Sequence, residues 1–266
     1  MNVKLNIKQL LLKVIPLLSA SLLSSFAYAE TAKGAWTALV AEDFRKRAEF
    51  AFVENNQKLP NVLIYGDSIS IHYTQAVRSE LEGKANVYRL YLNGGDSKSF
   101  IPKMTKMHHK MQDKQLADGW RFNWDVIHFN VGLHDLKYTH NRKLDKVNGQ
   151  QISSFSDYEK NLRANIQYLK QLAPNAKLIF ATTTPIPEGE PGRVVGDAAK
   201  YNEVALKVMK AHPEIHINDL YHFIKPNHEK WWAASRNVHY NPLGRQAQGK
   251  EVAKKIYSQL QAQRSL

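Results

Sequence analysis

The sequence predicts an α/β protein, a three-layer α/β/α sandwich around a five-stranded, mainly parallel sheet. Short apolar, partly β-branched runs recur along the chain, each about as long as a buried strand. Segments with apolar residues at helical spacing lie between them, and this alternation favours parallel pairing of the strands. Several runs end in polar turns that contain glycine. In an open α/β sheet such turns meet at the carboxyl edge, where ligands bind.

The N-terminal half is expected to begin with a helix and continue into three strands. Apolar residues recur at helical spacing from Trp36 to Phe52, which predicts one amphipathic helix outside the sheet. The next expected elements are a strand at 62–65, a helix near 75–82, a strand at 87–92, a helix at 100–111 and a strand at 124–131. The polar stretch 137–156 is typical of a long surface loop.

The C-terminal half continues the alternation. A helix is expected at 158–172, because Leu162, Ile166 and Leu169 share one face and Pro174 ends the pattern. The later elements are expected at 178–182 (strand), 197–211 (helix), 215–217 (strand) and 242–260 (closing helix). Residues 185–196, with three prolines and three glycines, predict a loop beside the carboxyl edge.

The composition describes an ordinary globular protein with a basic surface. Of the 266 residues, 43% are apolar and 23% are charged, which allows a sizeable core. The formal net charge is +13, and about +10 remains without the three lysines near the N-terminus. Such an excess favours anionic surroundings, whether polysaccharide, lipid headgroup or substrate carboxylate. The basic residues are scattered and no nucleic-acid motif is present, so nucleic acid is not an expected partner.

Residues 1–29 predict a secretory signal peptide. They contain three lysines and no acid, then a leucine-rich run, then Ala27-Tyr28-Ala29. An uncleaved membrane anchor is the alternative, although Lys13 and Pro16 interrupt the apolar run. We expect residues 30–266 to form a single exported domain, periplasmic or extracellular, with no stable insertion in the membrane.

The sequence indicates neither a metal nor a cofactor. It contains no cysteine, which excludes disulfides and zinc–thiolate sites. His108 and His109 are the one suggestive histidine pair, but adjacent residues on a helix face different ways. We therefore expect no metal site at this pair.

The stretch from Asn61 to Ser70, NVLIYGDSIS, is the part around which the rest is organised. Its apolar run predicts a buried strand, which stops at Gly66-Asp67-Ser68 before helix-compatible sequence. A serine on such a turn can point its hydroxyl into a crevice, with the amide groups of the helix start beneath it. The alternative is a serine that only caps the helix.

Three further motifs accompany this turn. The second strand is followed by Gly94-Gly95-Asp96, the third by Gly132-Leu133-His134-Asp135, and the closing helix is preceded by His239-Tyr240-Asn241-Pro242-Leu243-Gly244. In order and spacing, the set resembles the SGNH (GDSL-type) hydrolase family over about residues 61–255. The resemblance implies a flavodoxin-like fold and a carboxylic ester hydrolase that uses no cofactor.

The resemblance also implies roles for four positions. Ser68 would be the nucleophile and His239 its general base, because a hydroxyl attacks only when a neighbouring base takes its proton. The oxyanion hole would be formed by the amides of Ser68 and Gly95 and by the side chain at position 134.

Two residues depart from the family's pattern. Position 134 is histidine where the family has asparagine; a neutral imidazole can still donate a hydrogen bond, and Asn130 is an alternative donor that strand geometry disfavours. Arg236 stands where the family has the aspartate that orients the base. We expect a Ser–His dyad in which a main-chain carbonyl, the Asn237 amide or the more distant Asp135 accepts the other ring proton.

Four other residues have two interpretations each. Asp67 and Asp135 are possible supporting residues of the site, although bracing the turn and capping a helix are the simpler roles. Trp231 and Trp232 could form an aromatic wall for a sugar ring or could belong to ordinary packing.

The sequence thus predicts a secreted serine ester hydrolase that removes O-acetyl groups from a carbohydrate. Its expected substrate is a small-molecule or carbohydrate ester, and the basic surface favours an anionic one. Lipase, lysophospholipase or arylesterase activity is the nearest alternative. The alternative from another class is a catalytically impaired carbohydrate-binding protein, which the departures Arg236 and His134 would favour.

Overall fold

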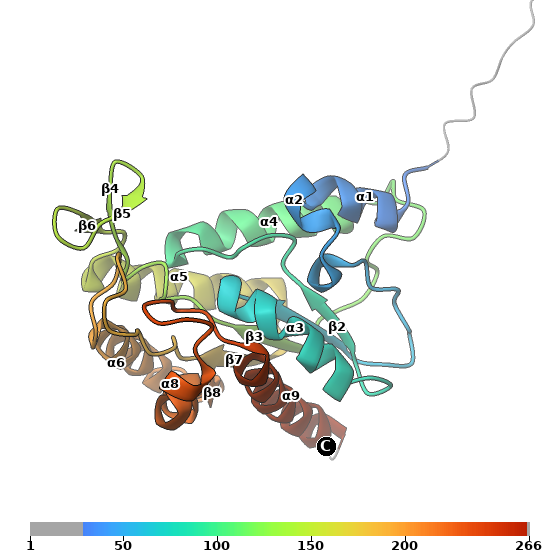
Figure 1. Ribbon diagram of the computed structural model, residues 1–266. Helices are drawn as coiled ribbons and strands as arrows, with labels where there is room; N and C mark the ends of the chain where they lie inside the picture. The colour runs from blue at the N-terminus through green and yellow to red at the C-terminus, as the bar shows by residue number, and fades with distance from the viewer. Residues whose placement is uncertain (1–28, 265–266) are drawn as a thin grey trace, which may run out of the picture.

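The computed structural model describes residues 29–264, so the predicted signal peptide lies outside the described residues except for Ala29. A five-stranded sheet forms the centre of the molecule (Figure 1). Its strands are β1 (Asn61–Tyr65), β2 (Asn86–Arg89), β3 (Val126–Phe129), β7 (Lys177–Ala181) and β8 (His216–Asn218). Their order is β2-β1-β3-β7-β8, and every neighbouring pair is parallel. The predicted fold class is therefore confirmed.

Helices cover both faces of the sheet. In Figure 1, α3 (Ser68–Glu80) and α9 (Pro242–Arg264) lie in front of it, and α4 (Phe100–Met111) and α5 (Phe155–Leu172) lie behind it. The α6 helix (Asp197–Lys210) packs against α5. All five residues of β1 are buried, as expected for a central strand that is covered on both faces.

The helices α3 and α9 approach each other closely. Gly249 of α9 makes this possible, because a Cβ at this position would collide with the Cβ of Ala76 and come 3.0 Å from the carbonyl oxygen of Tyr73. The predicted closing helix thus packs directly on the helix that begins at Ser68.

The predicted N-terminal helix at 36–52 is wrong. The segment forms α1 (Ala32–Leu39), α2 (Glu42–Arg45) and the short 3-10 helix η1 (Ala48–Phe50). The indole Nε1 of Trp36 donates to the carbonyl oxygen of Phe50 at 2.7 Å. A straight helix would hold these two residues about 21 Å apart, so the apolar residues reach the core by folding the segment back on itself.

The predicted surface loop at 137–156 contains a small antiparallel sheet. Its strands are β4 (Tyr138–His140), β5 (Lys143–Leu144) and β6 (Gln150–Gln151), in the order β5-β4-β6. Asn141 and Arg142 connect β4 to β5 with φ angles of 49° and 64°, as in a two-residue type I′ hairpin turn. We call residues 137–152 the β4–β6 lobe; it projects at the upper left of Figure 1.

The other elements follow the predictions to within a few residues. The basic helix α4 has the predicted bounds, whereas the helix expected near 75–82 begins earlier, at Ser68. The remaining short elements are η2 (Ser97–Ser99), α7 (Leu220–Ile224), η3 (Lys225–Asn227) and α8 (His228–Trp231). Within residues 29–264, no helix combines the length and hydropathy needed to cross a membrane.

Candidate active site

Ser68 is the first residue of α3, directly after the turn that ends β1. Asp67 caps this helix, since its Oδ1 accepts a hydrogen bond from the amide of Ile69 at 2.9 Å. Gly66 is needed at the turn, because a Cβ there would come 2.8 Å from the Cβ of Ser70. The serine hydroxyl thus lies at the carboxyl edge of the sheet, on a turn that a buried aspartate braces.

The Ser68 hydroxyl lies 2.9 Å from Nε2 of His239. On the other side of the ring, Nδ1 lies 2.8 Å from Oδ1 of Asn237, which also accepts the backbone amide of His239 at 2.9 Å. Because a backbone N–H can only donate, the atom that it contacts is the amide oxygen, and Nδ1 must carry the ring proton to bond to it. Nε2 then presents its lone pair to Ser68, which is the tautomer that a general base needs.

The loop that carries His239 is held on both sides. The carbonyl oxygen of His239 accepts a hydrogen bond from the amide of Ala233 at 2.9 Å. The backbone amide of Asn241 donates to the carbonyl oxygen of Trp231 at 2.8 Å. The ring of His72, one turn after Ser68 on α3, meets the His239 ring edge-on with centroids 5.2 Å apart. Burial lowers the pKa of His72 to about 4, so this neighbour adds no charge beside the base at neutral pH.

His239 is poised as a neutral base. Burial, followed by the positive charges of Arg193 and Arg245, lowers its pKa below the ordinary value of 6.5. Because only the neutral ring can take the proton of Ser68, kcat/KM should rise with pH through this lowered pKa. The acidic limb of the profile is therefore expected below pH 6.5.

Replacing Asn237 with aspartate should move that limb to higher pH. A carboxylate beside Nδ1 would stabilise the imidazolium and raise the pKa of His239 by about one pH unit or more. The measurement is the pH profile of kcat/KM for a soluble aryl ester. Arg236→Ala is the matched control from the same loop and should leave the pH profile unchanged. If the acidic limb of the Asn237→Asp profile coincides with that of the wild type, the side chain at position 237 does not orient the base.

Arg236 leaves the base without a carboxylate at the position where the family has one. Its side chain is exposed, and its Nε donates to the carbonyl oxygen of Gly189 at 2.7 Å. Its φ of 62° lies in the left-handed region. The residue after it, Asn237, supplies the acceptor instead.

Asp135 does not contact His239, and no helix begins after β3 for it to cap. Its carboxylate accepts the amide of Ser97 at 3.0 Å, the hydroxyl of Ser97 at 2.6 Å and the hydroxyl of Ser153 at 2.8 Å. These donors join the turn after β2, the turn after β3 and the end of the β4–β6 lobe. Burial raises the pKa of Asp135 to about 6. The expected helix cap is therefore wrong, and the residue ties three loops together.

His134 lies on the turn after β3 and offers one hydrogen-bond donor. Its Nδ1 lies 3.2 Å from Nζ of Lys137. Because an ammonium group can only donate, Nδ1 is the acceptor and Nε2 carries the proton. Burial, and then the charges of Lys137 and Arg193, lower the pKa of His134 to about 3, so the ring is neutral. The alternative donor, Asn130, already donates its amide to the carbonyl oxygen of Ala181 at 2.7 Å.

Gly95, on the turn after β2, has a φ of 72°, which favours glycine. Its amide donates to Oδ1 of Asn93 at 2.9 Å, so an oxyanion would have to replace this side chain as the acceptor. The turn is held by Nζ of Lys103, which donates to the carbonyl oxygens of Asn93 at 3.0 Å and Gly94 at 2.7 Å. Gly95 is thus an available donor only when Asn93 moves aside.

The two tryptophans before His239 are half-buried. Trp231 packs against Phe223 with ring centroids 5.7 Å apart, and Trp232 packs edge-on against His228 at 4.7 Å. Trp232 also forms an antiparallel bridge with Tyr240. Both rings therefore support the loop that carries the base, and a contact with substrate remains a prediction.

The described residues hold no group of three histidine, aspartate or glutamate side chains that could bind a metal ion. His108 is buried and accepts a hydrogen bond from the indole of Trp124 at 3.1 Å. The hydrolysis expected at Ser68 needs no Lewis acid, because the oxyanion is met by hydrogen-bond donors. We expect esterase activity to be unchanged after prolonged treatment with a chelator; a loss that a divalent ion restores would contradict this.

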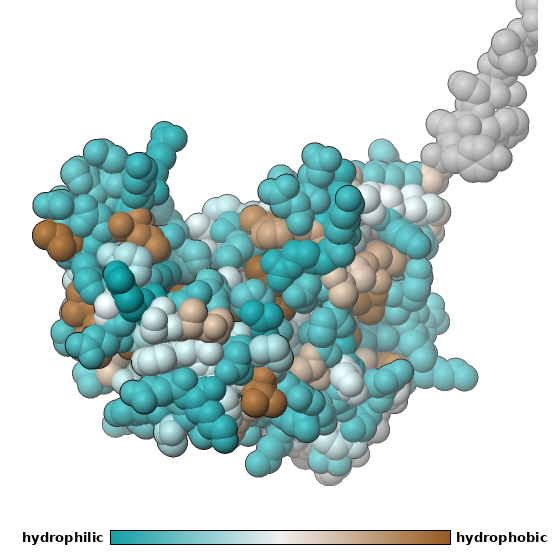
Figure 2. All heavy atoms as spheres, viewed as in Figure 1, coloured by the Kyte–Doolittle hydropathy of each residue, from teal (hydrophilic) through white to brown (hydrophobic). Residues whose placement is uncertain are grey.

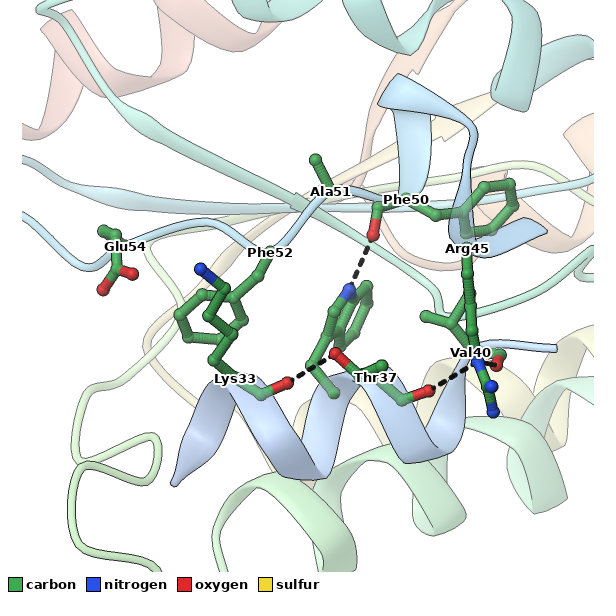
Figure 3. A pocket seen from close by; sticks show the side chains of 9 residues that line it. Lys33, Thr37, Val40, Arg45, Phe50, Ala51, Phe52 and Glu54 are labelled. Atoms are coloured by element: carbon green, nitrogen blue, oxygen red, sulfur yellow. Dashed lines mark hydrogen bonds between the residues drawn. The ribbon is translucent and has the colours of Figure 1, made fainter. Parts of the chain in front are cut away.

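A pocket of about 440 Å³, separate from the candidate active site, lies between α1 and the segment that follows η1 (Figure 3). Its lining includes Lys33, Thr37, Arg45, Phe52 and Glu54. None of the predicted site residues lines it.

Three residues near the site were not predicted from the sequence. Lys137 fixes the tautomer of His134, Lys103 holds the turn of Gly95, and His72 packs against His239. His72 lies four residues after Ser68 on α3, so its spacing would have placed it beside Ser68 if the helix had been predicted to begin at Ser68 and not near residue 75. The two lysines stand in unremarkable basic surroundings, and nothing in the sequence distinguishes them.

Comparison with known proteins points in the same direction. The sequence model of the GDSL-like lipase/acylhydrolase family matches residues 64–247, which is most of the chain. No curated protein sequence matches at a significant level.

Solved structures with a similar fold include several esterases. A lipase/acylhydrolase from Enterococcus faecalis superposes with a TM-score of 0.55 at 15% identity, over 74% of this chain and 95% of that one. The acetyl xylan esterase AlAXEase gives 0.55 at 19% identity, over 74% and 99% of the two chains. The acetylxylan esterase Axe2 from Geobacillus stearothermophilus gives 0.54 at 14% identity, over 74% and 94%. At these identities the similarity shows a shared fold.

Proposed function

Because the chain belongs to the GDSL-like lipase/acylhydrolase family and is an ester hydrolase, we propose that it removes O-acetyl groups from a carbohydrate by covalent catalysis at Ser68. The observation that carries this proposal is the chain of contacts from Ser68 through His239 to Asn237, at 2.9 and 2.8 Å. A protein that only bound carbohydrate would have no use for a serine and a histidine in this tautomer.

In the first half of the reaction, Ser68 Oγ attacks the acyl carbon while its proton passes to Nε2 of His239. The positive charge that forms on the ring is stabilised by Asn237, whose Oδ1 accepts the Nδ1 proton. The acyl oxygen becomes an oxyanion and meets the amide of Ser68, the Nε2–H of His134 and the amide of Gly95 once Asn93 has moved.

The bond between the acyl carbon and the sugar oxygen then breaks, and this oxygen takes the proton from His239. The acetyl group remains on Ser68 as an ester. In the second half, His239 takes a proton from a water molecule, the water oxygen attacks the acyl carbon, and the proton returns to Ser68 as acetic acid leaves and ionises to acetate in solution. The enzyme is restored with one ester hydrolysed and one water consumed.

Positive charge beside the acyl site supports an anionic acceptor. The charges of Lys137, Arg193 and Lys103 lower the pKa of His134 and the charge of Asp96 raises it, so three cations and one carboxylate lie within electrostatic reach of that ring. Arg193 is neutralised by a buried ion pair with Glu190 at 2.7 Å, whereas the two lysines form no ion pair in the described part of the chain. An acidic sugar beside the acetyl group would supply the counter-charge. The fold shared with two acetylxylan esterases also favours a carbohydrate ester.

Export is part of the proposal and rests on the N-terminal sequence. The basic start, the leucine-rich run and Ala27-Tyr28-Ala29 together favour a cleaved leader. A periplasmic or extracellular polysaccharide would then be within reach.

The proposal is tested by a matched series of substrates. Nitrophenyl esters of increasing acyl length report the size of the acyl site, and O-acetylated uronic-acid and neutral polysaccharides report the acceptor. We expect acetate to be the best acyl group and the acidic polysaccharide to be deacetylated faster. A preference for long acyl chains would identify a lipase instead, and equal rates on the two polysaccharides would remove the role given to Lys103 and Lys137.

A further inference from the structure

Exposed apolar side chains gather on the β4–β6 lobe, on the first residue of α5 and on the loop 187–196. In the part of the chain that the structure describes, seven large apolar side chains are exposed, and six of them belong to this group. The six, which we call the apolar patch, are Leu144, Val147, Ile152, Phe155, Val194 and Val195. Val147 is the most exposed at 84%, and the seventh residue, Leu243, lies apart at the start of α9. Figure 2 shows brown, apolar spheres on the lobe at the left of the molecule.

The β4–β6 lobe and the loop 187–196, which carry most of the patch, are hydrogen-bonded to each other. The backbone amide of Tyr138 donates to the carbonyl oxygen of Gly192 at 2.7 Å. Lys146 donates to two backbone carbonyl oxygens, to that of Pro191 through its amide at 3.2 Å and to that of Glu190 through Nζ at 2.7 Å. Leu144 lies against Gly192, where a Cβ would come 2.7 Å from the Cβ of the leucine. The β4–β6 lobe and the loop 187–196, which carry five of the six patch residues, are therefore braced against each other.

The lobe side of this surface is basic. The β4–β6 lobe contains Lys137, Arg142, Lys143 and Lys146 but only one acidic residue, Asp145, whereas the loop 187–196 carries the exposed Glu188 and the paired Glu190 and Arg193. Arg142 and Lys143 are exposed next to Leu144. Exposed apolar side chains rimmed by cations are the combination that binds an anionic bilayer surface, because the apolar groups enter the headgroup boundary while the cations meet the lipid charge.

We propose that the apolar patch docks the protein on a bilayer surface that contains anionic phospholipid. A contact of the loop 187–196 places this surface next to the catalytic site, since Arg193 of this loop donates to the carbonyl oxygen of Leu133 at 2.9 Å, one residue before His134. Docking would hold the site close to esters at or near the lipid surface. The proposal goes beyond the reaction at Ser68 and does not depend on it.

A second copy of the chain is the other candidate occupant, and charge disfavours it. The chain carries a net charge of +13, and two β4–β6 lobes brought together would oppose their cations. An anionic bilayer attracts the same cations.

The test is co-sedimentation with phosphatidylcholine vesicles, with and without phosphatidylglycerol. Each variant is purified in the form that export produces, and its intact mass confirms that all variants share one N-terminus. We expect the wild type to bind only the anionic vesicles, more weakly as salt rises. Val147→Asp should lower the partition coefficient about tenfold or more, because it removes an inserted apolar group and adds a repelled charge. Arg142→Gln combined with Lys143→Gln should lower it to a similar degree, about tenfold.

Leu243→Asp is the matched control, because it places the same change on an exposed apolar residue outside the patch; it should bind as the wild type does. Ser68→Ala should also bind fully, which separates docking from catalysis, and Val147→Asp should hydrolyse a soluble aryl ester at the wild-type rate. Failure of the wild type to bind anionic vesicles, or equal binding by Val147→Asp, would overturn the proposal. A dimer in sedimentation velocity that Val147→Asp converts to monomer would assign the patch to a second copy instead.

Discussion

Replacing Ser68 with alanine should abolish ester hydrolysis and covalent labelling by an organophosphonate ester. The loss in kcat is expected to be about 10⁴-fold or more, the usual effect of removing a serine nucleophile whose base and oxyanion donors remain in place. The contact between Ser68 and His239 is the reason, since Nε2 of the ring in its observed tautomer faces this hydroxyl at 2.9 Å and no other nucleophile within residues 29–264 is placed to form the acyl-enzyme. Intact mass spectrometry measures the labelling, with one adduct on the wild type and none on the variant.

Ser70→Ala is the matched control for this experiment. Ser70 lies two residues further along α3, and its hydroxyl donates to the carbonyl oxygen of Asp67 at 2.7 Å, so it has no base. This variant should still be labelled. An adduct that persists in Ser68→Ala would place the nucleophile elsewhere.

Replacing His134 with alanine should lower kcat by about 10²–10³, the usual cost of one missing oxyanion donor. His134→Asn should retain substantial activity, because an amide N–H offers the same kind of hydrogen bond. The loss in the alanine variant should not vary with pH across the neutral range, since the pKa of His134 is about 3 and the ring is neutral throughout.

His140→Ala is the control for the loss of an imidazole. This histidine is exposed at the end of β4, and its replacement should leave kcat unchanged. Steady-state kinetics on nitrophenyl acetate measures all three variants. If His134→Ala matches the wild type, the imidazole lies outside the reacting centre, and the Gly95 and Ser68 amides must stabilise the oxyanion without it.

The sheet and the turns at its carboxyl edge could be predicted from the sequence because both are locally encoded. Each strand is a short apolar run, and each site turn pairs a glycine with a polar residue at a strand end. The N-terminal helix was mispredicted because a tertiary contact, from Trp36 to Phe50, decides the path of that segment. The β4–β6 lobe was missed because its hairpin turn uses Asn141 and Arg142 in place of the usual glycine.

The orienting group of His239 shows the limit of prediction at the site. The sequence excluded an aspartate three residues upstream but left several acceptors open. Asn237 is the acceptor because of the path that the backbone takes after Arg236. The left-handed conformation of Arg236 cannot be predicted from the sequence pattern. Asp135 was a candidate by composition alone, and its hydrogen bonds with Ser97 and Ser153 explain why it serves elsewhere.

The close packing of α9 on α3 bears on when the protein becomes active during its own synthesis. Ser68 is the first residue of α3, His239 precedes α9 by three residues, and 171 positions separate the two side chains along the chain. Domains begin to fold from the N-terminus as the ribosome proceeds, and contacts between distant segments form late. The nucleophile can therefore take up its place on the sheet early, while its base arrives only when the last helix docks at Gly249. A nascent or C-terminally truncated chain that lacks α9 should accordingly lack a base beside Ser68, so that hydrolysis begins only with the finished molecule.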